Sequence, residues 1–88
     1  MQKSPLYLKA VTLRQLNDIS GIKHDLDKNM IMIIRITPLA QKDIEELRKA
    51  VEDLYSYVQS IGGDIARLGE ERVVLTPPVV KIWRNQLS

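Results

Sequence analysis

The stretch SIGGDIARLGEERVVLTPP, residues 60–78, decides the fold, because a helical pattern ends at its paired glycines and a hairpin follows. Two β-prone runs, Asp64 to Leu68 and Arg72 to Thr76, flank a Gly-Glu-Glu turn. Gly62 and Gly63 are typical of a helix end, because glycine adopts the left-handed conformation there without steric cost. Two prolines after Thr76 end the second strand.

A long amphipathic helix precedes these glycines. Asp43 and Glu46 have the spacing of a capping box, which predicts that the helix starts near Asp43. Its apolar side chains follow a three- and four-residue rhythm, with charged residues on the far side. These apolar positions are Ile44, Leu47, Val51, Leu54, Val58 and Ile61.

Ala50, Tyr55 and Tyr57 widen this apolar stripe to nearly half of the helix circumference. A single sheet contact needs only about 100°. Either the tyrosines cap the edge of the core, since tyrosine is often half-buried, or a partner covers this flank.

The first half of the chain predicts a strand, a helix and a second strand. Leu6 to Leu13 is rich in Leu, Val, Tyr and Thr and predicts a strand. A short amphipathic helix follows from about Asn17 to Asn29, with Asn17 or Asp18 as its N-cap. Met30 to Ile36 is apolar on both faces apart from its one arginine, which indicates a central strand. The Thr-Pro pair at positions 37–38 ends it.

The element order is therefore β-α-β-α-β-β in a single domain, residues 1–88. This order predicts an α/β sandwich with two helices packed on one face of a four- to five-stranded mixed β-sheet. Val79 to Trp83 forms either a last edge strand or a docking tail.

Composition narrows the class of protein. The chain is 44% hydrophobic and 27% charged, as in folded globular proteins. Its net charge of +2 comes from 13 basic and 11 acidic residues that are largely interspersed, so no nucleic-acid partner is expected. The absence of cysteine fits a reducing compartment, with the cytoplasm as the default. The longest apolar run, Met30 to Ile34, is far shorter than the roughly 20 residues of a membrane-spanning helix.

The sequence offers no set of catalytic or metal-binding residues. His24 is the only histidine, and no cysteine exists to complete a metal site. The acidic pairs Glu45-Glu46, Glu52-Asp53 and Glu70-Glu71 are adjacent in sequence, so their carboxylates diverge. The best-placed hydroxyl, Thr76, lies on a different element from His24. We expect no enzyme, no metal and no cofactor.

Three segments together resemble the core domain of the SepF family of FtsZ-binding cell-division proteins, in its archaeal form. They are YLKAVTL, ITPLAQKDIEELRKAVEDLYSYV and IGGDIARLGEERVVLTP, and the resemblance runs from about Tyr7 to Ile82. It implies a homodimeric α/β domain that binds the C-terminal peptide of FtsZ and links FtsZ filaments to the membrane. It also implies a cytoplasmic location at the inner face of the membrane at the division site.

The resemblance also implies site residues. Arg67 and Val73 correspond to hairpin positions where the family contacts the FtsZ peptide or pairs subunits, and Leu68 and Tyr57 are added as contact candidates. Gly62 and Gly63 correspond to the glycine turn on which polymerisation of bacterial members depends. Leu54 and Trp83 are the candidates for packing in the dimer, which could assemble further.

Two departures from the family pattern alter these expectations. Bacterial members often carry a large aromatic residue at the position of Val73, so the apolar contact with the peptide should be weaker or differently shaped here. Family members begin with an amphipathic membrane-targeting helix and a linker, whereas this sequence begins Met-Gln-Lys-Ser-Pro. Membrane contact is therefore expected only through an N-terminal segment absent here.

Two other functions compete with this one. An Alba-like or ribosomal-type nucleic-acid-binding domain shares the small size, the basic pI and a similar order of elements, but its long basic hairpin is replaced here by Gly69-Glu70-Glu71. A steep loss of affinity with salt would favour that class. The second alternative is a purely structural dimerisation module without a peptide groove.

Overall fold

The computed structural model describes residues 5–84. Its elements in chain order are β1 (Leu8–Thr12), α1 (Asp18–Asp27), β2 (Ile31–Arg35), α2 (Thr37–Lys42), α3 (Ile44–Ile61), β3 (Asp64–Leu68) and β4 (Arg72–Thr76).

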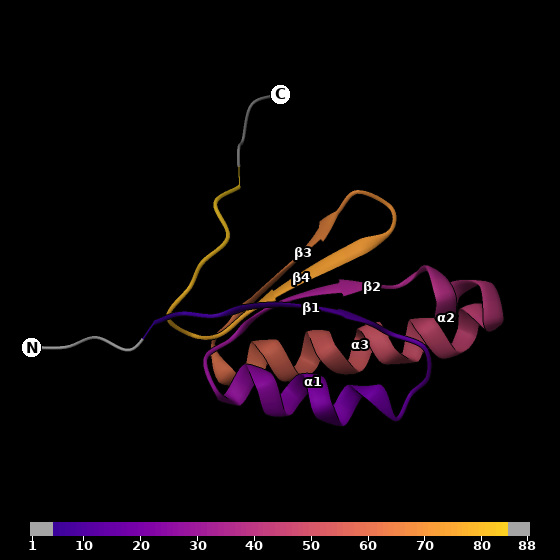
Figure 1. The fold of residues 1–88 in the computed structure, drawn as a ribbon, viewed down its shortest axis with the longest axis horizontal. Helices are drawn as coiled ribbons and strands as arrows, with labels where there is room; N and C mark the ends of the chain where they lie inside the picture. The colour runs from indigo at the N-terminus through magenta and orange to yellow at the C-terminus, as the bar shows by residue number, and fades with distance from the viewer. Residues whose placement is uncertain (1–4, 85–88) are drawn as a thin grey trace, which may run out of the picture.

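The four strands form one mixed sheet in the order β1-β2-β4-β3. β1 runs parallel to β2, while β4 pairs antiparallel with both β2 and β3. Figure 1 shows α1 and α3 lying side by side along one side of this sheet. The predicted α/β sandwich is thus confirmed, with four strands and with a third helix that the sequence did not predict.

The core lies between the sheet and the helices. Because side chains alternate along a strand, every second residue of β2 and β4 points toward α1 and α3. The buried strand residues on this side are Met32, Ile34, Val73 and Leu75. They meet the buried stripe of α3, which consists of Leu47, Ala50, Leu54 and Val58. Ile19, Ile22 and Leu26 supply the buried side of α1.

The opposite side of the sheet carries no helix among the described residues (Figure 1). We call it the open face. It is largely apolar, with one arginine pair at the end of β2 and the start of β4. By strand alternation its members are Leu8, Ala10, Thr12, Ile31, Ile33, Arg35, Asp64, Ala66, Leu68, Arg72, Val74 and Thr76.

The sequence does not predict the short helix α2, because a Thr-Pro pair also fits the end of a strand. Proline is also well suited to the first turn of a helix, where its missing N–H has no partner to lose. Pro38 occupies that position in α2, directly after β2. The segment therefore turns as a helix before α3 begins.

The predicted helix caps are half right. Asp43 accepts hydrogen bonds from the N–H groups of Glu45 and Glu46, both at 3.1 Å, as a capping residue should. The reciprocal half of the capping box is wrong, because the Glu46 carboxylate accepts from the N–H of Leu16 instead, at 3.3 Å. Asn17 stands at the N-cap of α1, but its side chain makes no capping bond.

The boundaries of α3 and the hairpin were predicted well. α3 ends at Ile61, and Gly62 follows in the left-handed conformation with φ of 79°. β3 and β4 span the predicted residues, with the turn at residues 69–71. Val79 to Trp83 is not a strand but a tail, and Ile44 is 60% exposed although it was expected in the apolar stripe.

Candidate functional site

A groove runs between α3 and the β3–β4 hairpin. It consists of two adjoining hollows of about 260 and 230 Å³, which share Val51 and Arg67. We call it the α3–β3 groove. Its apolar lining comprises Ile36, Leu47, Val51, Ile65 and Val73, and Ala66, whose side chain belongs to the open face, also borders it. Its outer rim comprises Ile44, Arg48, Glu52, Tyr55 and Arg67.

Local structure places the key residues of the groove. Val51 and Tyr55 are four residues apart on α3, so they lie one above the other on the flank that faces the hairpin. Arg67 stands directly opposite Val73 in the register of β3 with β4. Because β3 is the edge strand, no further strand of the described chain covers this side.

Arg67 is the cation at the centre of the groove. One of its guanidinium nitrogens, Nη2, donates a hydrogen bond to the carbonyl oxygen of Glu70, at 3.3 Å. The other rim arginine, Arg48, is paired with Glu45 at 3.3 Å, whereas Arg67 has no ion pair with any carboxylate of residues 5–84. The groove can therefore hold apolar side chains in its two hollows and a carboxylate between them.

The edge of β3 is partly occupied by the chain itself. The N–H of Ile65 donates to the carboxylate of Asp64 at 2.9 Å, and the carbonyl oxygen of Ile65 accepts from Arg84 at 2.6 Å. An added strand would need these same backbone groups. Recognition in the groove must therefore depend more on side-chain pockets than on the backbone groups of this edge.

The structure separates the four contact residues that the resemblance had grouped. Arg67 and Val73 lie together in the groove. Val73 is only 4% exposed, so it forms the floor and belongs to the core. Leu68, which is 52% exposed, points to the open face.

Tyr57 lies away from the groove, at the contact of α3 with α1. Its hydroxyl donates to the carboxylate of Asp27, which raises the pKa of Tyr57. The ammonium group of Lys23 lies 5.2 Å from the centre of the ring and pairs with Asp53 at 3.0 Å. This cluster fastens α1 to α3.

The remaining predicted residues have clear local environments. Leu54 is 2% exposed and lies in the core, so it is not available to a second subunit in this fold. Trp83 is 91% exposed. Gly62 ends α3, and Gly63 donates its N–H to the carbonyl oxygen of Val58 at 2.9 Å. Their role in assembly stays a prediction.

Tyr55 and Ile65 line the groove but were not predicted as site residues. The spacing of Tyr55 from Val51 was visible in the sequence, as part of the widened stripe of α3. The contribution of Ile65 depends on which edge of the sheet β3 occupies, and no local signal carries that information.

Within residues 5–84, no helix is both long enough and apolar enough to cross a membrane. In the same part of the chain, no three His, Asp or Glu side chains are grouped as metal ligands would be.

Fold and groove define a class of small α/β sandwich domains with an apolar groove beside an edge hairpin, a surface suited to a short peptide. Within this class, the chain belongs to the family described as "Cell division protein SepF", whose model matches residues 8–82. A comparison with curated proteins gives no match.

Solved structures agree with this assignment. The SepF-like protein from Archaeoglobus fulgidus is 28% identical, with a TM-score of 0.83 over 93% of this chain and 98% of that chain. The SepF-like protein from Pyrococcus furiosus is 29% identical, with a TM-score of 0.85 over 94% of this chain and 100% of that chain. SepF from Methanobrevibacter smithii, solved in complex with FtsZ-CTD, shares the fold at 13% identity, with a TM-score of 0.79 over 90% of this chain and 99% of that chain.

Proposed function

We propose that this domain binds the C-terminal peptide of FtsZ in the α3–β3 groove. It does so as a homodimer, and it is the part that holds FtsZ where FtsZ filaments are linked to the membrane at the division site. The role is one of binding, without catalysis or a cofactor, on the cytoplasmic side of the membrane. The observation that carries the proposal is the guanidinium group of Arg67, which lies between two apolar hollows and forms no ion pair with a carboxylate of residues 5–84.

The chemistry of the groove defines the peptide that fits. Two apolar side chains would enter the hollows on either side of Arg67, and a carboxylate between them would pair with its guanidinium group. An interface of this size supports an affinity of about 1 to 100 μM for one peptide. A dimer that holds two tails of one FtsZ filament would bind far more tightly through effective concentration.

The open face is the surface that we assign to the second copy. Its centre is apolar, formed by Ala10, Ile33 and Val74, and no element of the described chain covers it. An apolar sheet face left in water favours association. A two-fold contact between two open faces would bury the same surface on both copies and close the assembly.

The two alternative functions have less support. Four of the basic side chains, those of Lys9, Lys23, Arg48 and Arg84, form ion pairs with carboxylates of the same chain. This pattern does not favour the continuous basic surface that nucleic acid requires. A purely structural module would not need a groove with Arg67 at its centre and without an ion pair to any carboxylate of residues 5–84.

Calorimetric titration of the domain with a synthetic FtsZ C-terminal peptide tests the proposal. We expect Arg67→Glu to weaken binding at least tenfold, because it places a carboxylate where the peptide's carboxylate would lie. Lys49→Glu is the matched control, since it makes the same charge reversal at an exposed position of α3 that does not line the groove. Equal affinity for the wild type and Arg67→Glu, or no binding by the wild type, would contradict the proposal.

A further inference from the structure

We infer that Trp83 is an anchor between subunits, held by residues 79–84 of its own chain and packed against the hairpin of a second copy. We call residues 79–84 the C-terminal arm. The inference rests on the proposed homodimer, and it adds to the contact between the two open faces a contact made by the C-terminal arm.

The C-terminal arm is fixed to its own domain by side-chain hydrogen bonds. Asp64 accepts from the N–H of Ile82 at 2.9 Å and from the guanidinium group of Arg84 at 3.0 Å. Thr76 donates its hydroxyl to the carbonyl oxygen of Val80 at 2.8 Å, and Lys81 reaches the carbonyl oxygen of Gly62 at 2.9 Å. The arm therefore has a defined path.

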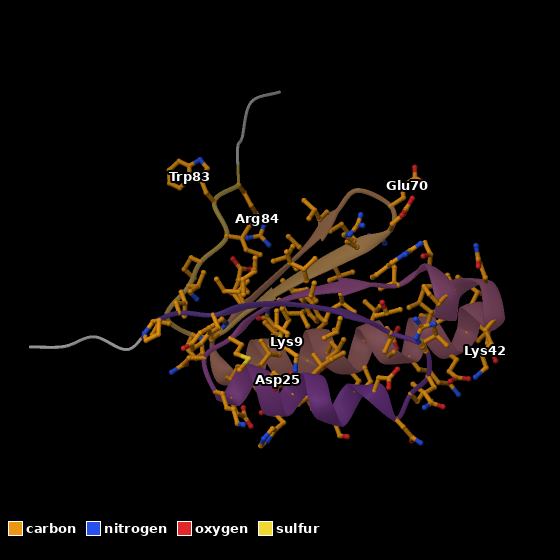
Figure 2. The ribbon with its side chains drawn as sticks, viewed as in Figure 1. Lys9, Asp25, Lys42, Glu70, Trp83 and Arg84 are labelled. Carbon is orange, nitrogen blue, oxygen red and sulfur yellow. The ribbon has the colours of Figure 1, made fainter. Side chains whose placement is uncertain are left out.

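This path leaves the largest apolar side chain of the arm in water. Figure 2 shows Arg84 turned toward the sheet, while Trp83 projects beyond the strands on the side away from the helices. Val79 in the same arm is also strongly exposed. A tryptophan that an ordered segment holds out into solvent is typical of a binding hot spot, because its large ring contributes most when a partner buries it.

The position of the arm indicates that the partner is a second copy. The arm turns back over the Thr76 end of β4, where it borders the open face. With strands about 4.8 Å apart and five residues rising about 3.3 Å each, the open face measures roughly 19 by 17 Å. This rectangle of about 320 Å² falls short of the roughly 800 Å² per partner in a standard stable interface. The arm supplies further area on the same surface.

The arginine pair limits how two open faces can meet. Arg35 and Arg72 are direct cross-strand partners at the end of the sheet far from the arm. With a two-fold axis parallel to the strands, the arginine pair of one subunit would lie against the arginine pair of the other. Repulsion between these like charges disfavours that arrangement. A two-fold axis across the strands avoids this and brings each arm to the partner's Leu68, at the far end of β3. Leu68 is exposed and belongs to the open face.

Intrinsic fluorescence tests this contact directly, because Trp83 is the only tryptophan of the chain. Sedimentation over a range of concentrations first locates the monomer–dimer transition. We expect the emission maximum to move to shorter wavelength, and quenching by acrylamide to fall, over the same concentrations. Trp83→Ala and Leu68→Ser should each weaken dimerisation at least tenfold. Leu16→Ser, a control at an exposed apolar residue that lies on neither the open face nor the groove, should leave dimerisation and emission unchanged.

The outcomes separate this inference from the proposed function. A dimer in which Trp83 still has the emission of a solvent-exposed tryptophan would contradict the proposed Trp83 contact. It would not contradict FtsZ binding or dimerisation. A monomer at all concentrations would overturn both the anchor and the proposed dimer. Titration of Trp83→Ala with the FtsZ peptide should give the wild-type affinity for a single site, since Trp83 does not line the groove.

Discussion

Gly63 and the carbonyl oxygen of Thr76 are so close that a Cβ atom on Gly63 would overlap this oxygen. The same Cβ would also lie 3.3 Å from the Cγ1 atom of Val58. Gly63 follows α3, and Thr76 is the last residue of β4. The absence of a side chain at position 63 therefore lets the end of α3 approach the end of the hairpin.

Substitution of the glycines by alanine should give three different results in urea unfolding. Gly63→Ala should lower the free energy of unfolding by about 3 kcal/mol, because the new methyl group meets backbone that cannot move freely. Gly62→Ala should cost about 1 kcal/mol, because only the left-handed conformation opposes it. Gly21→Ala, within α1 and facing open space, should stabilise by up to about 1 kcal/mol. Equal losses for Gly62→Ala and Gly63→Ala would contradict the close approach.

Val73→Asp and Arg67→Glu should differ in stability, although both residues line the groove. Val73 belongs to the core, so an aspartate there would bury a charge and lower the free energy of unfolding by several kcal/mol. Arg67 is exposed, and its reversal should change stability by less than about 0.5 kcal/mol. Circular dichroism during thermal unfolding measures both. A folded, stable Val73→Asp protein would show that this residue is not part of the core.

Leu54→Ala should separate core packing from subunit contact. It leaves a cavity beneath α3, which should cost about 2 to 5 kcal/mol in urea unfolding. At concentrations where the variant is folded, sedimentation should give the wild-type dimerisation constant. Trp83→Ala should show the reverse pattern, with nearly unchanged stability of the monomer and weaker association. A direct loss of association in folded Leu54→Ala would instead support Leu54 as a subunit contact.

Acid should release the C-terminal arm through Asp64. The hydrogen bond from Arg84, followed by that from the N–H of Ile82, lowers the pKa of Asp64 from 3.8 to about 2. Because the pKa in the folded state lies below the unfolded value, this stabilisation is present above pH 3.8 and is lost as the pH falls toward 2. The loss should be about 1 kcal/mol after solvent screening of a partly exposed pair. The difference in unfolding free energy between the wild type and Asp64→Asn should shrink over this pH range, and a constant difference would contradict the assignment.

The sequence predicted α3 and the hairpin because their signals are local. The helix depends on a repeating apolar spacing, and its end depends on the backbone freedom of Gly62. The turn depends on Gly69, which has φ of 71°. The helix α2 was not predicted, because a Thr-Pro pair is compatible with both the end of a strand and the start of a helix. Tertiary packing selects the helix, in which the side chain of Leu39 is buried.

The candidate site was predicted only in part. Arg67 and Val73 are cross-strand neighbours, as hairpin register alone predicts, and their contact with a peptide stays a prediction. Tyr57 lies apart from them, because the helix pattern shows how wide an apolar stripe is but not which element lies beside each flank. In the folded chain α1 covers the side of Tyr57, and the hairpin covers the side of Tyr55.

Amino-acid order was thus sufficient for every helix and strand except α2 and for the layer architecture, because periodicity, capping and glycine conformation act within a few residues. Tertiary packing alone determined the surroundings of three residues. Val73 forms the floor of the groove and belongs to the core, and Leu68 faces away from the groove. Trp83 is exposed to solvent on an arm that Asp64 holds by hydrogen bonds. The exposure of each of these side chains depends on neighbours that lie many residues away in the chain. Only the order of strands in the sheet, with β3 at its edge, brings those neighbours together or leaves them out.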